Sequence, residues 1–143
     1  MDCYLDPSAV GFAVFKALPR DEPIHMLNLL RFRDRAEYLA DHPNAGKGWT
    51  GRQAYAEYGR TSGPIFQRVG GRIVWRGAFQ VMVIGPEDRQ WDDGFVAEYP
   101  TSAAFLEMVT DPEYRTAVIN RSAAVLDSRL IRFDPDRVSG NGF

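Results

Sequence analysis

The chain has 143 residues, of which 45% are hydrophobic and 25% charged, and its 17 basic and 19 acidic residues give a net charge of −2. This length favours a single domain, and the balanced charge argues against nucleic acid as a partner, because nucleic acid requires a clustered basic face. No apolar run approaches the roughly 20 residues that cross a bilayer. The single cysteine, Cys3, cannot form an internal disulfide. We therefore expect a cytoplasmic protein that binds neither nucleic acid nor a membrane.

A helix is predicted near the N-terminus. Asp6 is the expected N-cap, Pro7 the first helical residue, and Pro19 the stop. Its apolar side chains recur at helical spacing: Val10, Val14, Phe15 and Leu18. We expect residues 1–22 to form an appended helix outside the central fold.

The run from Pro23 to Arg33 predicts a strand in the interior of a sheet. Both of its faces are apolar, which indicates cover on both sides. An alternating pattern places Asn28 on one face and His25 on the other, so that one polar residue interrupts each face.

Residues 34–51 are longer than an ordinary connection and contain Pro43, Gly46 and Gly48. Two interpretations remain open: a lid over a pocket, or a solvated insertion. A helix then begins at Thr50 as its cap, and Gly59 and Gly63-Pro64 are expected to break or kink it.

The longest β-prone run is residues 70–85, which we interpret as the central strand of the sheet. Alternation places Arg72 and Arg76 on one face, and Trp75 and Gly77 on the other. The gap that Gly77 leaves in its row indicates either a β-bulge or a close approach by a helix or ligand.

The remaining pattern is strand, helix, strand. Residues 91–100 predict a strand antiparallel to the second, and Thr101 or Ser102 caps a helix over residues 103–109. A further helix starts at Asp111-Pro112. Residues 129–133 form the last strand, and residues 134–143 are a polar tail. The order predicts an α+β, ferredoxin-like βαββαβ core over residues 23–133, with two helices on one face of an antiparallel sheet.

The other face of this sheet needs cover, because the first strand is apolar on both sides. Since no helix of the chain is left for it, we expect a homodimer that packs through the sheet face.

An ordered series of short segments resembles the domain-of-unknown-function 1330 family over roughly residues 23–133. The segments are Tyr55-Ala56-Glu57-Tyr58, Gly70-Gly71-Arg72, Arg76-Gly77, the run from Tyr99 to Ala104, Asp111-Pro112-Glu113-Tyr114, and Arg121. The N-terminal helix and the 34–51 insertion depart from the short members of the family. The resemblance implies a dimeric α+β barrel. It supplies no catalytic residue, and relatives in that superfamily look like cofactor-independent monooxygenases, isomerases, haem-handling enzymes and ligand binders.

Arg121 is the strongest site candidate, because it lies on the apolar stripe of the last helix, where an unpaired guanidinium is costly. Glu98 stands alone in an otherwise apolar strand and is its expected partner. One hypothesis is a buried ion pair that fixes helix to sheet. The other is that Arg121 holds the carboxylate or enolate of a ligand while Glu98 orients it.

The other candidates are weighed in the same way. His25 fits a core histidine or a proton shuttle, and Asn28 a satisfied amide or a donor to a carbonyl. Aromatic side chains that fit either ordinary packing or the border of a pocket are Tyr55, Tyr58, Trp75, Tyr99 and Tyr114. The two histidines, 17 residues apart, predict no metal site, and we expect no cofactor.

Three functions follow from these candidates. The first is a protein that binds a small organic ligand, with no reaction assigned. The second is a cofactor-independent monooxygenase or isomerase acting on a small carbonyl or phenolic compound, with His25, Asn28 and Arg121 as the catalytic candidates. The third is a structural or interaction dimer in which every polar residue is merely satisfied.

Overall fold

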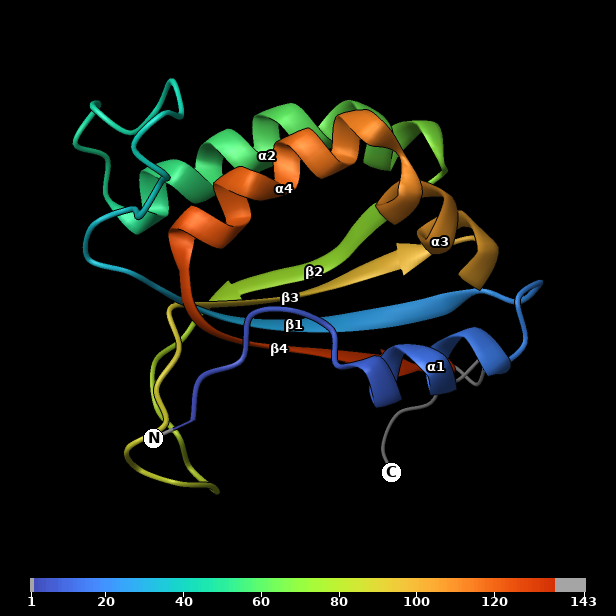
Figure 1. Ribbon diagram of the computed structural model, residues 1–143. Coiled ribbons are helices and arrows are strands. Elements are labelled where there is room, and N and C mark those ends of the chain that lie inside the picture. The colour runs from blue at the N-terminus through green and yellow to red at the C-terminus, as the bar shows by residue number, and fades with distance from the viewer. Residues whose placement is uncertain (1, 136–143) are drawn as a thin grey trace.

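The structure, a computed structural model, describes residues 2–135 (Figure 1). Its elements are, in chain order, α1 (Ala9–Ala17), β1 (Ile24–Phe32), α2 (Gly51–Arg68), β2 (Arg72–Ala78), β3 (Asp93–Tyr99), α3 (Ser102–Thr110), α4 (Pro112–Ala124) and β4 (Val125–Phe133). The strands form one sheet in the order β2-β3-β1-β4, and every neighbouring pair is antiparallel. This topology confirms the predicted α+β, ferredoxin-like fold.

β1 occupies the interior of the sheet, as predicted, because it pairs with β3 on one side and β4 on the other. Ile24, Met26 and Leu30 are buried on the face that α2 and α4 cover (Figure 1). The alternate residues of β1 are only partly buried. The apolar interior therefore lies between the sheet and these two helices.

β2 is an edge strand, so the prediction that residues 70–85 form the central strand is wrong. The strand ends at Ala78 and pairs only with β3. The β-prone residues beyond it belong to residues 79–92, which extend away from the sheet on the side opposite α2 and α4 (Figure 1). Val83 and Ile84 in this extension are 85% and 92% exposed. Composition alone does not separate such an extension from a buried strand.

A register shift between Ile73 and Trp75 changes the faces of β2. Ile73 pairs with Ala97, and Arg76 pairs with Phe95. Because residues paired across a ladder share a face, Ile73 and Arg76 point toward the helices, whereas Trp75 points away from them. The predicted grouping of Arg72 with Arg76 is therefore wrong, since a bulge inserts one residue into the alternation.

α2 runs without interruption through Gly59 and Pro64, so of the predicted break or kink the break is absent. Proline removes one helical hydrogen bond, but the carbonyl left without a donor belongs to the exposed Arg60, where water can replace the bond. The start of the helix is as predicted. Thr50 accepts from the Gln53 amide, and the Gln53 side chain accepts from the Thr50 amide.

Gly51 joins the start of α2 to the end of β1. Its amide donates to the Arg33 carbonyl at 3.0 Å, and the Arg33 amide donates to the Ala124 carbonyl at 2.8 Å. A Cβ at position 51 would lie 2.3 Å from the Arg33 oxygen and 2.6 Å from the Ala124 oxygen. Only glycine allows this approach of three backbone segments.

The N-cap of α1 is Ser8, whose side chain accepts from the Gly11 amide, and not the predicted Asp6. The predicted apolar stripe is largely exposed, and Val10 is 76% exposed. Phe15 instead belongs to the core and packs against Phe105 with ring centroids 5.0 Å apart. The division of the chain into residues 1–22, 23–133 and 134–143 stays a prediction, although Phe15 ties the first of these parts to the core.

The C-terminal half follows the prediction closely. Thr101 caps α3, and Asp111 caps α4 with Pro112 in its first turn. β4 begins at Val125, four residues earlier than predicted, directly where α4 ends. Of the predicted tail, residues 136–143 lie outside the described residues.

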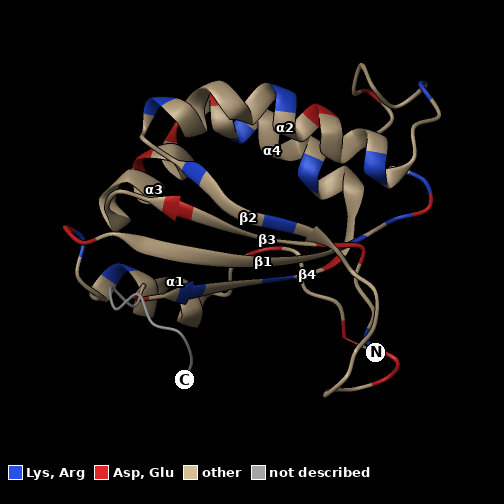
Figure 2. Cartoon of the chain, turned by 180° about the vertical axis from the view of Figure 1, so that it is seen from behind, with Lys and Arg blue, Asp and Glu red and all other residues tan. Residues whose placement is uncertain are grey.

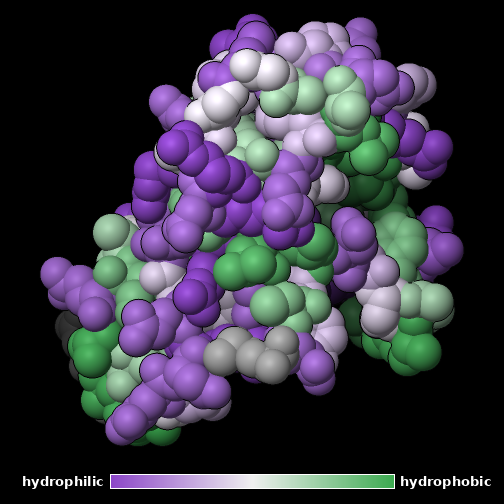
Figure 3. Space-filling view, turned by 60° about the vertical axis from the view of Figure 1, so that its left-hand side comes forward, coloured by the Kyte–Doolittle hydropathy of each residue, from purple (hydrophilic) through white to green (hydrophobic). Residues whose placement is uncertain are grey.

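Basic and acidic residues are interspersed along the helices, strands and loops of the chain (Figure 2). Hydrophobic groups break the polar surface at several places in the lower half of Figure 3. Among residues 2–135, no helix is both long enough and apolar enough to span a membrane.

Candidate functional site

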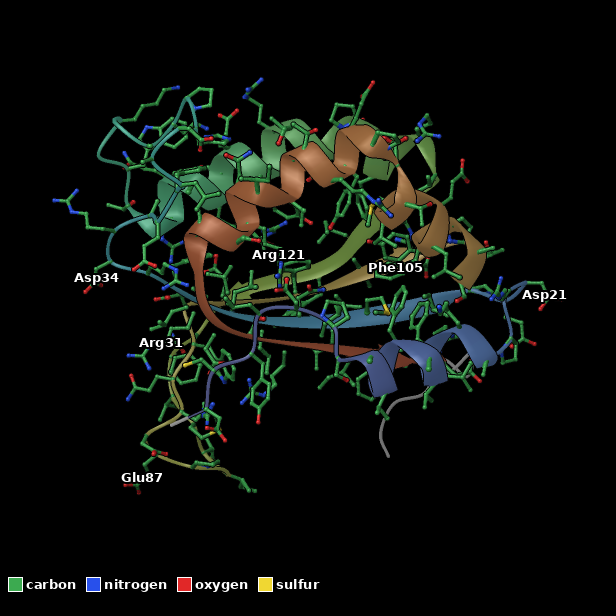
Figure 4. All side chains as sticks on the ribbon, in the orientation of Figure 1. Asp21, Arg31, Asp34, Glu87, Phe105 and Arg121 are labelled. Carbon is green, nitrogen blue, oxygen red and sulfur yellow. The ribbon has the colours of Figure 1, made fainter. Side chains whose placement is uncertain are left out.

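A cavity of about 1000 Å³ lies between the sheet and the helices. Its floor comes from all four strands, its roof from α2, α3 and α4, and one wall from residues 4–18. Arg121 of α4 and Phe105 of α3 both point into the space above the sheet (Figure 4). A cavity of this volume can hold a small organic molecule.

Four residues form a row across the floor of this cavity. In the ladder, Asn28 pairs with Phe95 on one side and with Leu130 on the other, and Phe95 pairs with Arg76. The Arg76 guanidinium lies over the Phe95 ring, 4.9 Å from its centroid. The row thus places an arginine and an amide on either side of Phe95, with Leu130 beyond the amide.

Ten aromatic side chains line the cavity. They are Tyr4, Phe12, Phe15, Tyr55, Tyr58, Phe66, Phe95, Tyr99, Phe105 and Tyr114. The Tyr58 and Tyr114 hydroxyls share a hydrogen bond of 2.7 Å. Burial raises the pKa of Tyr55, Tyr58, Tyr99 and Tyr114 above the usual range, so all four are neutral hydrogen-bonding groups at physiological pH.

Arg121 does not pair with Glu98, and that prediction is wrong. The guanidinium donates from Nη1 to the Leu5 carbonyl oxygen at 2.7 Å and from Nη2 to Ser128 Oγ at 3.2 Å. A guanidinium has five N–H donors, so three of them are not used by residues 2–135. No carboxylate of the described residues contacts Arg121.

Asn28 and Tyr55 also keep unused polar atoms. The side-chain Nδ2 of Asn28 donates to the Met26 carbonyl oxygen at 3.1 Å, but its Oδ1 accepts no hydrogen bond from residues 2–135. Within the same described part of the chain, the Tyr55 hydroxyl makes no hydrogen bond, although its ring packs against Phe32 and Tyr58. Both residues line the cavity, so a bound molecule can satisfy these atoms.

The cover of the cavity is the N-terminal segment and not the 34–51 insertion. Tyr4, Leu5 and Phe12 are among the lining residues, whereas no residue of 34–50 is. The insertion packs near the C-terminal end of α4, where the Tyr38 hydroxyl donates to Asn120 Oδ1 at 2.5 Å. It is therefore not a lid over this cavity.

Three of the predicted site residues lie on the face of the sheet opposite the cavity: His25, Glu98 and Trp75. His25 Nε2 contacts Glu98 Oε2 at 2.7 Å, and Arg72 Nε donates to Glu98 Oε1 at 2.8 Å. These bonds to His25 and Arg72 lower the pKa of Glu98. Trp75 shares this face, and none of the three predicted residues lines the cavity.

Trp75 also explains the missing side chain at Gly77. A Cβ at Gly77 would lie 3.0 Å from the Trp75 ring, and one at Gly94 would lie 3.6 Å from it. The indole ring therefore lies over two glycines that face each other across β2 and β3. The gap holds a side chain of the same strand and not a helix or ligand.

The structure thus brings together Asn28, Tyr55, Tyr58, Tyr99, Tyr114 and Arg121 from the predicted site. It adds Arg76, which the sequence indicated only as a strand residue, and Phe15 and Arg132. Arg132 donates to the carbonyl oxygens of Phe15 and Pro19 at 3.1 and 2.8 Å. The sequence feature that could have indicated Arg132 as a cavity residue is its position as a charged residue between two apolar residues of the last strand.

Among residues 2–135, no group of three or more histidine, cysteine, aspartate or glutamate side chains is placed to hold a metal ion. Apart from the carboxylate of the exposed Asp6, the polar side chains of the cavity carry guanidinium, amide and hydroxyl groups, which are suited to an organic ligand with oxygen acceptors.

The family model for a domain of unknown function, DUF1330, matches residues 48–132, which is more than half of the chain. The chain therefore belongs to this family. Among curated proteins, none matches it.

Two crystal structures of the RPA0582 protein, described as a protein of unknown function from Rhodopseudomonas palustris, are similar over nearly the whole length. The methylated form is 54% identical with a TM-score of 0.86, covering 96% of this chain and 98% of that one. The other is 52% identical with the same TM-score, covering 96% of this chain and all of that one.

A more distant likeness is to SnoaB, a cofactor-independent oxygenase from Streptomyces nogalater. It is 12% identical with a TM-score of 0.51, and the match covers 82% of this chain and 96% of SnoaB. At this identity the likeness shows a shared fold alone.

Proposed function

We propose that this protein binds a small, flat organic molecule in the cavity between the sheet and the helices. The observation that carries the proposal is a cavity of about 1000 Å³ in which aromatic walls surround unused donors and acceptors of Arg121, Asn28 and Tyr55. These unused atoms are accessible from the cavity, and a few polar groups in an apolar lining give a ligand its orientation.

Binding is favoured over acid–base catalysis by the position of His25. The enzymatic alternative used His25 to move a proton, yet this residue lies on the far face of the sheet with Glu98. The tyrosines of the cavity have a raised pKa and act as neutral partners. The absence of a cofactor and the cytoplasmic location stay predictions.

The test uses two probes of nearly equal size, 2-naphthoate and 2-naphthalenemethanol. We expect at least one to bind with one site per chain and to shift the NMR resonances of the cavity residues. Gly63 lines the cavity, and a Cβ there meets no atom within 4 Å. Gly63→Phe should therefore fill the space and abolish binding.

The matched control is Gly46→Phe, which adds the same ring in a loop outside the cavity. The proposal is wrong if neither probe binds the native protein, or if both phenylalanine variants bind as the native protein does.

We also propose that two copies pack through the sheet face that the helices leave uncovered. This face carries the exposed ring of Trp75, 54% exposed, together with Ile131 and Phe133, 41% and 51% exposed. His25 and Arg72 both contact Glu98 near one end of this face, so these three polar groups are paired with one another. An exposed apolar face of this kind suits a symmetric contact.

A further inference from the structure

The cavity carries positive charge without a matching negative charge. Four arginines line it, and Asp6, which is exposed, is the single acidic residue of the lining. Arg129 is paired with Asp127 at 2.8 Å. The other three, Arg76, Arg121 and Arg132, have no carboxylate partner among residues 2–135.

Two of these arginines, Arg76 and Arg121, keep unused donors and line the same cavity as Tyr55. Burial raises the pKa of Tyr55, and the charges of Arg121 and Arg76 oppose that rise. Arg132 differs, because carbonyl oxygens and Ser102 Oγ occupy its Nη atoms. The arginines with donors available to a ligand are therefore Arg76 and Arg121.

The roles of the two arginines are complementary. Arg121 is partly buried and fixed by its bonds to Leu5 and Ser128. Arg76 is exposed on the edge strand, makes no hydrogen bond within residues 2–135, and lies over Phe95. One guanidinium is thus held rigidly inside the cavity, and the other is free to close on a group that enters beside it.

We propose that the ligand is an aromatic acid whose carboxylate, or an equivalent delocalised oxyanion, is held between Arg76 and Arg121 with a hydrogen bond from the Tyr55 hydroxyl. This inference rests on the proposed binding function and adds the charge and orientation of the ligand. Arginine pairs with planar oxyanions through two parallel hydrogen bonds. The ring then lies over the floor at Phe95, with the Asn28 oxygen left for a donor on the ring.

The experiment compares the affinities of 2-naphthoate and 2-naphthalenemethanol by titration calorimetry. The native protein should prefer the acid by at least about tenfold, because hydrogen bonds to charged groups are the stronger kind. Arg76→Gln should weaken naphthoate binding by about tenfold and leave the alcohol unchanged. Tyr55→Phe removes an unpartnered hydroxyl, so it should keep the fold and weaken the acid several-fold.

The matched control is Arg115→Gln, which removes one positive charge from an exposed position of α4 outside the cavity. It should leave both affinities unchanged. Equal affinity for acid and alcohol in the native protein overturns the anion inference while the binding function stands. Equal effects of Arg76→Gln and Arg115→Gln also overturn it, and failure of both probes to bind refutes both proposals.

Discussion

The Arg121 guanidinium donates to the Leu5 carbonyl oxygen at 2.7 Å and so joins α4 to a residue 116 positions earlier in the chain. Ser128 strengthens the same junction, because its hydroxyl donates to the Tyr4 carbonyl at 2.7 Å while its Oγ accepts from Arg121 at 3.2 Å. The N-terminal segment is therefore a fixed wall of the cavity.

Arg121→Met should loosen this wall. Losing the bonds to Leu5 and Ser128 should lower the free energy of unfolding by about 1.5–3 kcal/mol and speed amide hydrogen exchange in residues 2–8. Arg115→Met, on the exposed side of the same helix, should change stability by less than about 0.5 kcal/mol. Equal exchange in the two variants would show that Arg121 does not hold the segment.

Asp127 should govern stability in acid. Burial opposes its ionisation, but the Tyr4 amide and the Arg89 and Arg129 guanidinium groups outweigh this effect and lower the pKa of the carboxyl. A carboxyl whose folded pKa lies below the unfolded value of about 3.9 stabilises the fold above that pH. This contribution is lost as the pH falls through the folded pKa.

Asp127→Asn should therefore cost about 3 kcal/mol at neutral pH, since it leaves two arginines without their buried partner. Urea unfolding followed from pH 7 to pH 2 should show a flatter profile for this variant than for the native protein. Asp6→Asn, at an exposed carboxyl, provides the control and should keep the native profile. Parallel profiles for native protein and Asp127→Asn would contradict the assignment.

Gly51→Ala and Gly59→Ala should act in opposite directions, although both place alanine in α2. The first forces a methyl group against the Arg33 and Ala124 oxygens and should cost about 1–3 kcal/mol. At Gly59 a Cβ meets nothing within 4 Å, so alanine should stabilise the helix by about 0.4–1 kcal/mol. Urea midpoints measure both, and a stable Gly51→Ala would mean that the three segments can separate at little cost.

Trp75→Asp should prevent the proposed dimer, because it replaces an exposed apolar ring of the uncovered sheet face with a charge. Sedimentation velocity at micromolar concentration should show a dimer for the native protein and a monomer for the variant. Val10→Asp alters an exposed apolar residue of α1 and should remain dimeric. A native protein that sediments only as a monomer rules the dimer out.

The sequence predicted the fold well where the signals are local. Thr50 and Asp111 as caps, and a first strand apolar on both faces, determine helix starts and the interior position of β1 without knowledge of the tertiary structure. The position of β2 in the sheet was missed, because its β-prone side chains are the same in an exposed edge as in a buried strand. The bulge after Ile73 then reversed the faces expected for Arg76.

Local patterns likewise indicated some of the residues that line the cavity, but not how the charged side chains pair. Periodicity grouped Asn28 with the apolar residues Met26 and Leu30 of β1 and placed Arg121 on the apolar stripe of α4, and both Asn28 and Arg121 line the cavity. Glu98 was paired with Arg121 because both are isolated charges, although its alternation with Tyr99 places it on the other face of β3. Which isolated charges meet depends on the packing of helices on the sheet, which no local pattern contains.

Trp75, spread over Gly77 and Gly94, gives the protein an optical reporter. Indole emission shifts to shorter wavelength when water leaves its surroundings. Trp91 is only 8% exposed, whereas Trp75 is 54% exposed on the open sheet face. Whatever covers that face should therefore be visible in the intrinsic fluorescence of the native chain, without a label.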